Sequence, residues 1–144
     1  MRSITKVIMV VLIILFGSMY IEYTEAKKKD DVIQRFQEYM EAWRREDFEL
    51  IWEMMSQKEK HGNDNSIESF KSFVLENGVH PYGYEKIGKV KIDGGVATFE
   101  ATILYREFSG LYAGKEIEEF QFVFEDGMWR FDDFKTLADD RQGR

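Results

Sequence analysis

Residues 97–106 read ATFEATILYR, and two sets of side chains alternate along this stretch. Neighbouring side chains of a β-strand point to opposite faces of the sheet, so the alternation predicts a strand with one buried face. The residues expected on that face are Ala97, Phe99, Ala101, Ile103 and Tyr105. The other face carries Thr98, Glu100, Thr102 and Arg106.

A second alternating segment contains Phe120, Phe122 and Phe124 on one face. The dipeptides Asp93-Gly94 and Asp126-Gly127 are typical of tight hairpin turns, and glycines 110 and 114 bracket another turn. We therefore expect an antiparallel meander of about four strands between residues 84 and 134.

In the segment before Gly78, apolar residues recur at the spacing of an α-helix. The first predicted helix has a stripe at three- and four-residue spacing, made of Val32, Ile33, Phe36, Tyr39, Met40 and Trp43. Asp30 or Asp31 would cap this helix, and Asp47 would cap a second one. The polar run 57–65 is expected to connect to a third helix, in which Asn65 and Glu68 form a capping box and Gly78 is the stop. Three helices followed by strands predict an α+β domain over residues 32–134.

The N-terminus predicts export. Arg2 and Lys6 precede the apolar run 7–16, which is the pattern of a signal peptide or an N-terminal membrane anchor, assigned to residues 1–26. Cleavage after Ala26 and retention as an anchor through residues 7–21 both stay open. Residues 27–31 are expected to form a charged hinge, and residues 135–144 a polar tail. The domain would then be extracytoplasmic, either secreted or held at the outer face of the cytoplasmic membrane.

Composition and motifs exclude several function classes. The net charge of −7 and the lack of a basic stripe argue against a nucleic-acid partner, and a chain with no cysteine has no disulfide or thiolate site. Residues 83–89 match the start of a phosphate-binding loop, but Val90 stands where Ser or Thr would hold magnesium. His61 and His80 lack metal-ligand spacing and are expected at the surface or in a turn. We predict no metal and no cofactor.

Glu118 is the acidic residue with a distinctive position. It lies two and four positions before Phe120 and Phe122, and alternate residues of a strand share a face, so its side chain should point toward the core side of the sheet. Because acids are seldom buried, we expect Glu118 at an open, wet rim. Trp43 and Trp129, in contrast, are expected to be buried.

The order of elements also resembles a known family. Gln34-Arg35-Phe36, then residues 43–48, and a meander that ends with residues 125–131 (EDGMWRF) resemble the nuclear-transport-factor-2-like (NTF2-like) superfamily, whose cone fold ketosteroid isomerases and SnoaL-type cyclases share. The resemblance implies a curved sheet that wraps the first helix and leaves a cavity. It places Tyr39 at the oxyanion-hole tyrosine of the isomerases and Glu118 at their protonated acid. It supplies no counterpart of their general base.

Without that base the sequence favours a non-catalytic binding or assembly module with a partly apolar cavity, whose partner would be a protein or a small apolar ligand. The alternative is an isomerase- or cyclase-like enzyme that acts on an apolar small molecule through Tyr39 and Glu118. These hypotheses differ in whether Tyr39 and Glu118 meet in an open cavity or are sealed off by aromatic side chains.

Overall fold

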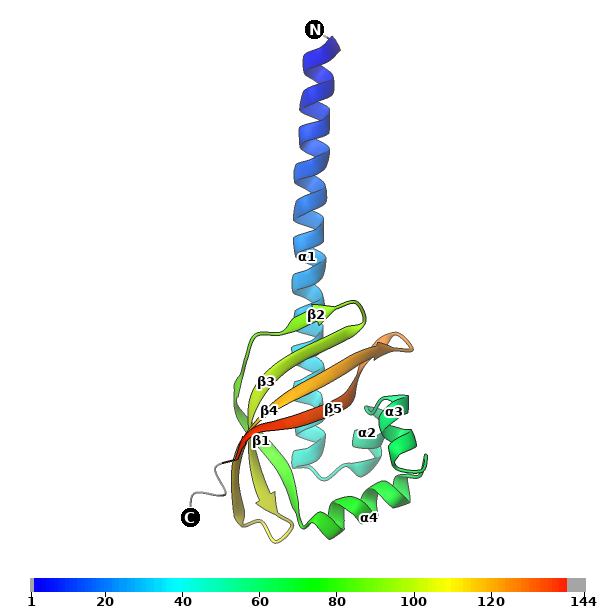
Figure 1. Ribbon diagram of the computed structural model, residues 1–144, viewed down its shortest axis with the longest axis vertical. Coiled ribbons are helices and arrows are strands. Elements are labelled where there is room, and N and C mark those ends of the chain that lie inside the picture. The colour runs from blue at the N-terminus through cyan, green and yellow to red at the C-terminus, as the bar shows by residue number, and fades with distance from the viewer. Residues whose placement is uncertain (1, 140–144) are drawn as a thin grey trace.

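Within residues 2–139, which the computed structural model describes, four helices precede a five-stranded antiparallel sheet (Figure 1). The helices are α1 (Arg2–Arg44), α2 (Phe48–Glu53), α3 (Gln57–Gly62) and α4 (Ile67–Asn77). This confirms the α+β class and the single change of period at Gly78, with one helix and one strand more than predicted.

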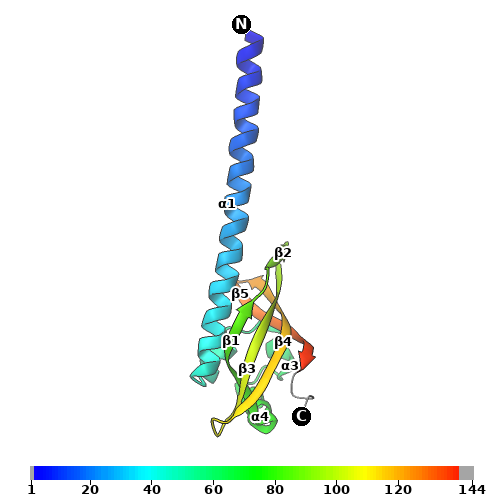
Figure 2. The same cartoon turned by 90° about the vertical axis from the view of Figure 1, so that its left-hand side faces the viewer.

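The strands form a meander that curves around one end of α1 (Figures 1 and 2). They are β1 (Val79–Ile87), β2 (Lys91–Asp93), β3 (Val96–Glu107), β4 (Tyr112–Glu125) and β5 (Met128–Asp139), and the sheet order is β1-β3-β4-β5. β1 pairs with residues 101–107 of β3 and β2 with residues 96–98, so β1 and β2 lie end to end along one edge. Register shifts in the β1–β3, β3–β4 and β4–β5 pairs add local twist, which helps the sheet to curve.

The helix α1 runs without a break from the apolar N-terminal segment into the domain, so residues 27–31 are not a hinge (Figure 1). Neither Asp30 nor Asp31 is a cap. These residues include no Gly or Pro, and Lys27 stands four positions before Asp31, a favourable spacing on a helix. Helix formation therefore propagates across this segment. Among the described residues, α1 is the one helix that is long and apolar enough to cross a membrane, and its apolar stretch is not buried.

The C-terminal third of α1 forms the centre of the core. Phe36 is fully buried, and its ring centroid lies 5.0 Å from those of Phe99 and Phe120 and 5.4 Å from that of Tyr84. Trp43 is 7% exposed, which confirms the prediction that this face of α1 is buried. Trp129, at 6%, is buried as predicted.

The short helices lie beside the concave side of the sheet, and side chains cap them (Figure 1). The Asp47 carboxylate accepts a hydrogen bond from Leu50 N at 3.1 Å, as predicted. The segment 57–65, expected to be a polar connection, contains α3, which Ser56 caps by accepting from Glu59 N at 3.2 Å. Ser66, rather than Asn65, caps α4.

The two ends of the sheet differ from the prediction. β5 continues to Asp139, so the sheet includes five residues assigned to the polar tail, and residues 140–144 lie outside the described part. Phe124 lies two and four positions after Phe122 and Phe120, yet it is 53% exposed, and its ring contacts that of Trp129 at a centroid distance of 5.4 Å. Gly78 adopts φ 77° at the end of α4, as expected for a helix stop.

Candidate functional site

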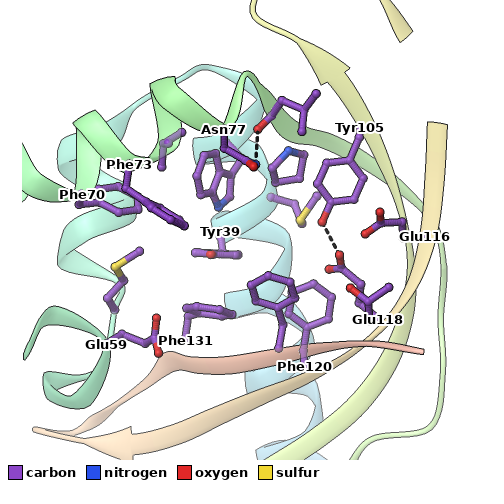
Figure 3. Close-up of a pocket in the computed structure, with 18 of the residues that line it drawn as sticks. Tyr39, Glu59, Phe70, Phe73, Asn77, Tyr105, Glu116, Glu118, Phe120 and Phe131 are labelled. Atoms are coloured by element: carbon purple, nitrogen blue, oxygen red, sulfur yellow. Dashed lines mark hydrogen bonds between the residues drawn. The ribbon is translucent and has the colours of Figure 1, made fainter. Parts of the chain in front are cut away.

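A cavity of about 370 Å³ lies between the end of α1, the helices α3 and α4, and the inner face of the sheet (Figure 3). Its inner wall is aromatic and includes Tyr39, Trp43, Phe70, Phe120 and Phe131. Phe73 and Phe134 also line it, and they are 66% and 50% exposed, which places them at the mouth. Tyr39 and Glu118, the two pocket residues predicted from the sequence, both line this cavity.

Tyr39 occupies the middle of this cavity (Figure 3). Its ring stacks on Phe131 with centroids 4.8 Å apart and meets Trp43 edge-on at 6.2 Å. Burial raises the pKa of Tyr39 well above 10, so the phenol stays protonated and is a hydrogen-bond donor at physiological pH. The Trp43 indole has the opposite, smaller effect on the pKa of Tyr39, and within residues 2–139 its Nε1 makes no hydrogen bond of normal geometry.

Glu118 is buried, 1% exposed, so the prediction of a wet rim is wrong. Its parity was predicted correctly, but Tyr105 of the adjacent strand β3 covers it and donates a hydrogen bond from its hydroxyl to Glu118 Oε1 (Figure 3). Burial, and after it the charge of the Glu118 carboxyl, raises the pKa of Tyr105 far above 10, which keeps this donor protonated. Glu116, two residues earlier on β4, is 5% exposed and lines the same wall.

Glu59 supplies a third carboxyl group, which the sequence argument missed. It belongs to α3 and lies on the other side of Tyr39 from Glu118 in the view of Figure 3. Burial, together with the negative charge of Asp133, raises the pKa of Glu59, while Lys58 opposes this change. The available signal was the spacing of Ser56 and Glu59, which is the capping-box pattern that begins a helix.

His80 lies behind the cavity wall and is 1% exposed, so its prediction as a surface or turn residue is wrong. Its ring lies nearly parallel to the Trp43 indole, with centroids 6.4 Å apart. His80 Nε2 is 3.2 Å from Glu46 Oε1, and Nδ1 is 2.9 Å from the Pro81 carbonyl oxygen. These contacts fix the His80 ring against the Trp43 indole, which lines the cavity. His61 is exposed, as predicted.

The described residues contain no group of three or more His, Cys, Asp or Glu side chains that could hold a metal ion. The sequence similar to a phosphate-binding loop, residues 83–89, lies in β1 and the connection to β2, with no helix behind it. The polar groups in the cavity lining are tyrosine and threonine hydroxyls, asparagine amides and glutamate carboxyls.

Comparison with known proteins supports the fold. No protein-family model matches the sequence, and no curated protein matches it either. Among solved structures, an NTF2-like protein with a cystatin-like fold from Novosphingobium aromaticivorans superposes with a TM-score of 0.60 at 11% identity, over 85% of this chain and 90% of that one. Aln2 from a Streptomyces species gives 0.53 at 15% identity, over 81% and 93% of the two chains.

A protein of unknown function with a cystatin-like fold from Nostoc punctiforme gives a TM-score of 0.54 at 12% identity, over 75% of this chain and 88% of that one. These similarities establish the NTF2-like fold, as the resemblance in the sequence predicted. At such low identity they show the fold alone, and any function has to be argued from the cavity.

Proposed function

We propose that this chain of NTF2-like fold is a non-catalytic binding domain on the outer side of the cytoplasmic membrane, and that its cavity takes a small molecule with an apolar body. The observation that carries the proposal is the cavity of about 370 Å³ with an aromatic wall and a buried Tyr105–Glu118 pair. Ligand pockets typically combine about 300–1,000 Å³ of mostly apolar volume with a few polar groups that fix orientation.

The membrane part of the proposal rests on α1. Its apolar residues from Val7 to Phe16 are all exposed, and exposure of large apolar side chains to water costs about 25 cal/mol per Å². Insertion into a bilayer, or removal as a signal peptide, would relieve this cost. Because α1 continues directly into the core, a retained anchor would hold the cavity at a fixed place relative to the bilayer.

A pair of variants on β5 tests whether the cavity binds. Thr136 lines the cavity, whereas its neighbour Lys135 does not and is exposed. We expect Thr136→Trp to narrow the mouth and Lys135→Trp to leave it unchanged. The probe is the neutral compound 1-adamantanol, added to the full chain in phosphatidylcholine nanodiscs, and the readout is the NMR signal of the Trp43 indole N–H.

We expect saturable shifts of the Trp43 signal in the wild type and in Lys135→Trp, and affinity weaker by about tenfold in Thr136→Trp, equivalent to about 1.4 kcal/mol. Trp52 and Trp129 are absent from the cavity lining and serve as internal references. Equal weakening by both variants, or shifts of all three indole signals together, would contradict binding in the cavity.

One observation favours an enzyme as the second candidate. Glu59, with a raised pKa, and Glu118 stand on opposite sides of Tyr39, and carboxyl groups in different environments are typical of acid–base pairs. In an isomerase- or cyclase-like reaction Glu59 would take the proton, and Tyr39 would donate a hydrogen bond to the substrate oxygen. Incubation of a bound compound with the wild type and with Glu59→Gln distinguishes the two functions. In an enzyme the wild type converts the compound and the variant does not. In a binding domain the compound is recovered unchanged from both.

A further inference from the structure

His80, the buried histidine behind the cavity wall, has neighbours that make opposite demands on one ring nitrogen. Its Nδ1 lies 2.9 Å from the Pro81 carbonyl oxygen, which only accepts, so Nδ1 carries a hydrogen. Its Nε2 accepts a hydrogen bond from Arg106 Nε at 3.4 Å, which requires a lone pair on Nε2. The same Nε2 lies 3.2 Å from Glu46 Oε1, a distance at which a protonated Nε2 donates to the carboxylate. His80 therefore has one partner for the neutral ring and another for the protonated ring.

The two partners of Nε2 belong to different elements. Arg106 lies on β3, and its Nη2 also donates a hydrogen bond to the Arg44 carbonyl oxygen at 2.9 Å. Glu46 follows the end of α1 with a φ of 55°, and its N–H donates to the Trp43 carbonyl oxygen at 3.0 Å. A left-handed conformation at a residue with a side chain persists where neighbouring contacts hold it. Within residues 2–139, Glu46 and Arg106 are the two charged side chains that an ion pair or a hydrogen bond joins to the His80 ring.

Protonation of the imidazole would exchange one partner for the other. In the protonated ring Nε2 donates to Glu46 Oε1, and the two groups carry opposite charges. Arg106 then loses its acceptor on the ring and meets a like charge, but it keeps the Arg44 carbonyl oxygen. A buried imidazolium is costly unless it is paired, and Glu46 supplies the pairing. The protonated ring is thus held through both nitrogens by bonds that it donates.

The state of the ring reaches the cavity through Trp43. The Trp43 indole lines the cavity and lies nearly parallel to the His80 ring, with centroids 6.4 Å apart, while Phe108 packs on the same ring at 4.7 Å. A positive charge near the face of an indole attracts that face, so a protonated ring would hold the Trp43 wall more firmly. A wall that is fixed before the ligand arrives costs less to order on binding.

We propose that His80 is a proton-dependent switch, whose protonated ring pairs with Glu46, holds Trp43 in place and so tightens the cavity around its ligand in acid. This inference rests on the proposed function and adds the regulation of the same cavity. Histidine suits the role because it is the side chain that ordinarily changes its charge between about pH 5 and pH 8.

The neutral probe 1-adamantanol tests the switch, because its own charge is the same throughout this pH range. It is titrated into the full chain in phosphatidylcholine nanodiscs at about pH 5 and about pH 8, with the NMR signal of the Trp43 indole N–H as readout. We expect binding about fivefold tighter at the lower pH, which is the lower end of the usual coupling between two sites. The nitrogen NMR signal of His80 Nε2 should move over the same pH range as the affinity.

Two variants assign the pH dependence to the switch. His80→Gln should remove it, because the glutamine side chain gains no charge at either pH. Glu46→Gln should leave the affinity at about pH 8 within about twofold and reduce the difference between the two pH values to less than about twofold, since the protonated ring loses its charged partner. The Glu46 side chain is 41% exposed, so this variant also serves should His80→Gln fail to fold.

Two further variants are controls that should keep the pH dependence. His61 is the other histidine of the chain and is exposed, so His61→Gln changes the same residue type away from the switch. Glu59 lines the cavity and burial raises its pKa, so Glu59→Gln removes the cavity carboxyl most able to imitate the effect.

The outcomes separate the two proposals. Equal affinity at the two pH values, or weaker binding in acid, overturns the switch and leaves the binding domain standing. No binding at either pH overturns both. A pH dependence that persists in both His80→Gln and Glu46→Gln, or that is lost in Glu59→Gln or His61→Gln, also overturns the switch, because another group would be its source.

Discussion

Phe36→Ala is the sharpest test of the packing between α1 and the sheet. The Phe36 side chain is fully buried, and four aromatic rings surround it at centroid distances of 5.0, 5.0, 5.4 and 6.4 Å. Replacing a buried Phe by Ala typically costs about 3–5 kcal/mol, and ring contacts of this kind place the expected loss in the upper half of that range. A loss of about 4 kcal/mol is a large fraction of the 5–15 kcal/mol that stabilise an ordinary domain.

Urea denaturation of the full chain in nanodiscs, followed by tryptophan fluorescence, measures this loss. With a slope of about 2 kcal/mol per M urea, a change of about 4 kcal/mol moves the midpoint down by about 2 M. Phe73→Ala is the matched control, because Phe73 is 66% exposed, and surface changes usually stay within about 0.5 kcal/mol.

A midpoint shift below about 0.5 M for Phe36→Ala, equivalent to about 1 kcal/mol, would refute the packing described for α1. So would equal losses for Phe36→Ala and Phe73→Ala, since the two positions differ chiefly in burial.

Three further predictions concern the core, the pH dependence and the membrane. Trp43→Ala and Trp129→Ala should each cost about 3–5 kcal/mol by the same assay, and a loss under about 1 kcal/mol at Trp43 would mean that its face of α1 is turned outward. Burial raises the pKa of Glu59, so ionisation of this carboxyl is disfavoured in the folded state. The stability that the protonated carboxyl contributes is fully present below about pH 4.3 and is lost as the pH rises through the folded-state pKa. Glu59→Gln should therefore be more stable than the wild type at pH 7 and show a smaller difference at pH 4, and the opposite order in urea titrations would contradict the burial of this group. External protease should digest the domain in intact cells if the apolar segment exports it, whereas protection until lysis would place the domain in the cytoplasm.

Local patterns in the sequence predicted most of the elements and the inner faces of α1 and β3, but one helix and one strand fewer than the structure has. The spacing of Val32, Phe36 and Trp43 defined the buried stripe of α1, and the alternation from Ala97 to Tyr105 defined the inner face of β3. Turn residues located the hairpins, and the order of elements pointed to the cone fold. These properties depend on neighbours within a few residues along the chain, which is why a single sequence reveals them.

The burial of the polar side chains could not be obtained in this way. Parity placed Glu118 on the correct face, but its burial depends on Tyr105 from the neighbouring strand. His80 is buried because Trp43 and Phe108, which are distant in sequence, pack on its ring. Glu59 reaches the cavity only because α3 folds beside β5.

Sequence alone thus determined the α+β order of elements, the helical and strand faces and the acidic, cysteine-free chemistry of this protein. The tertiary structure decided that Tyr39, Glu59 and Glu118 share one open cavity and that α1 continues unbroken through residues 27–31. The physical reason is that periodicity records which side of an element faces inward, whereas burial, pKa and access to a ligand depend on what other elements place above that side.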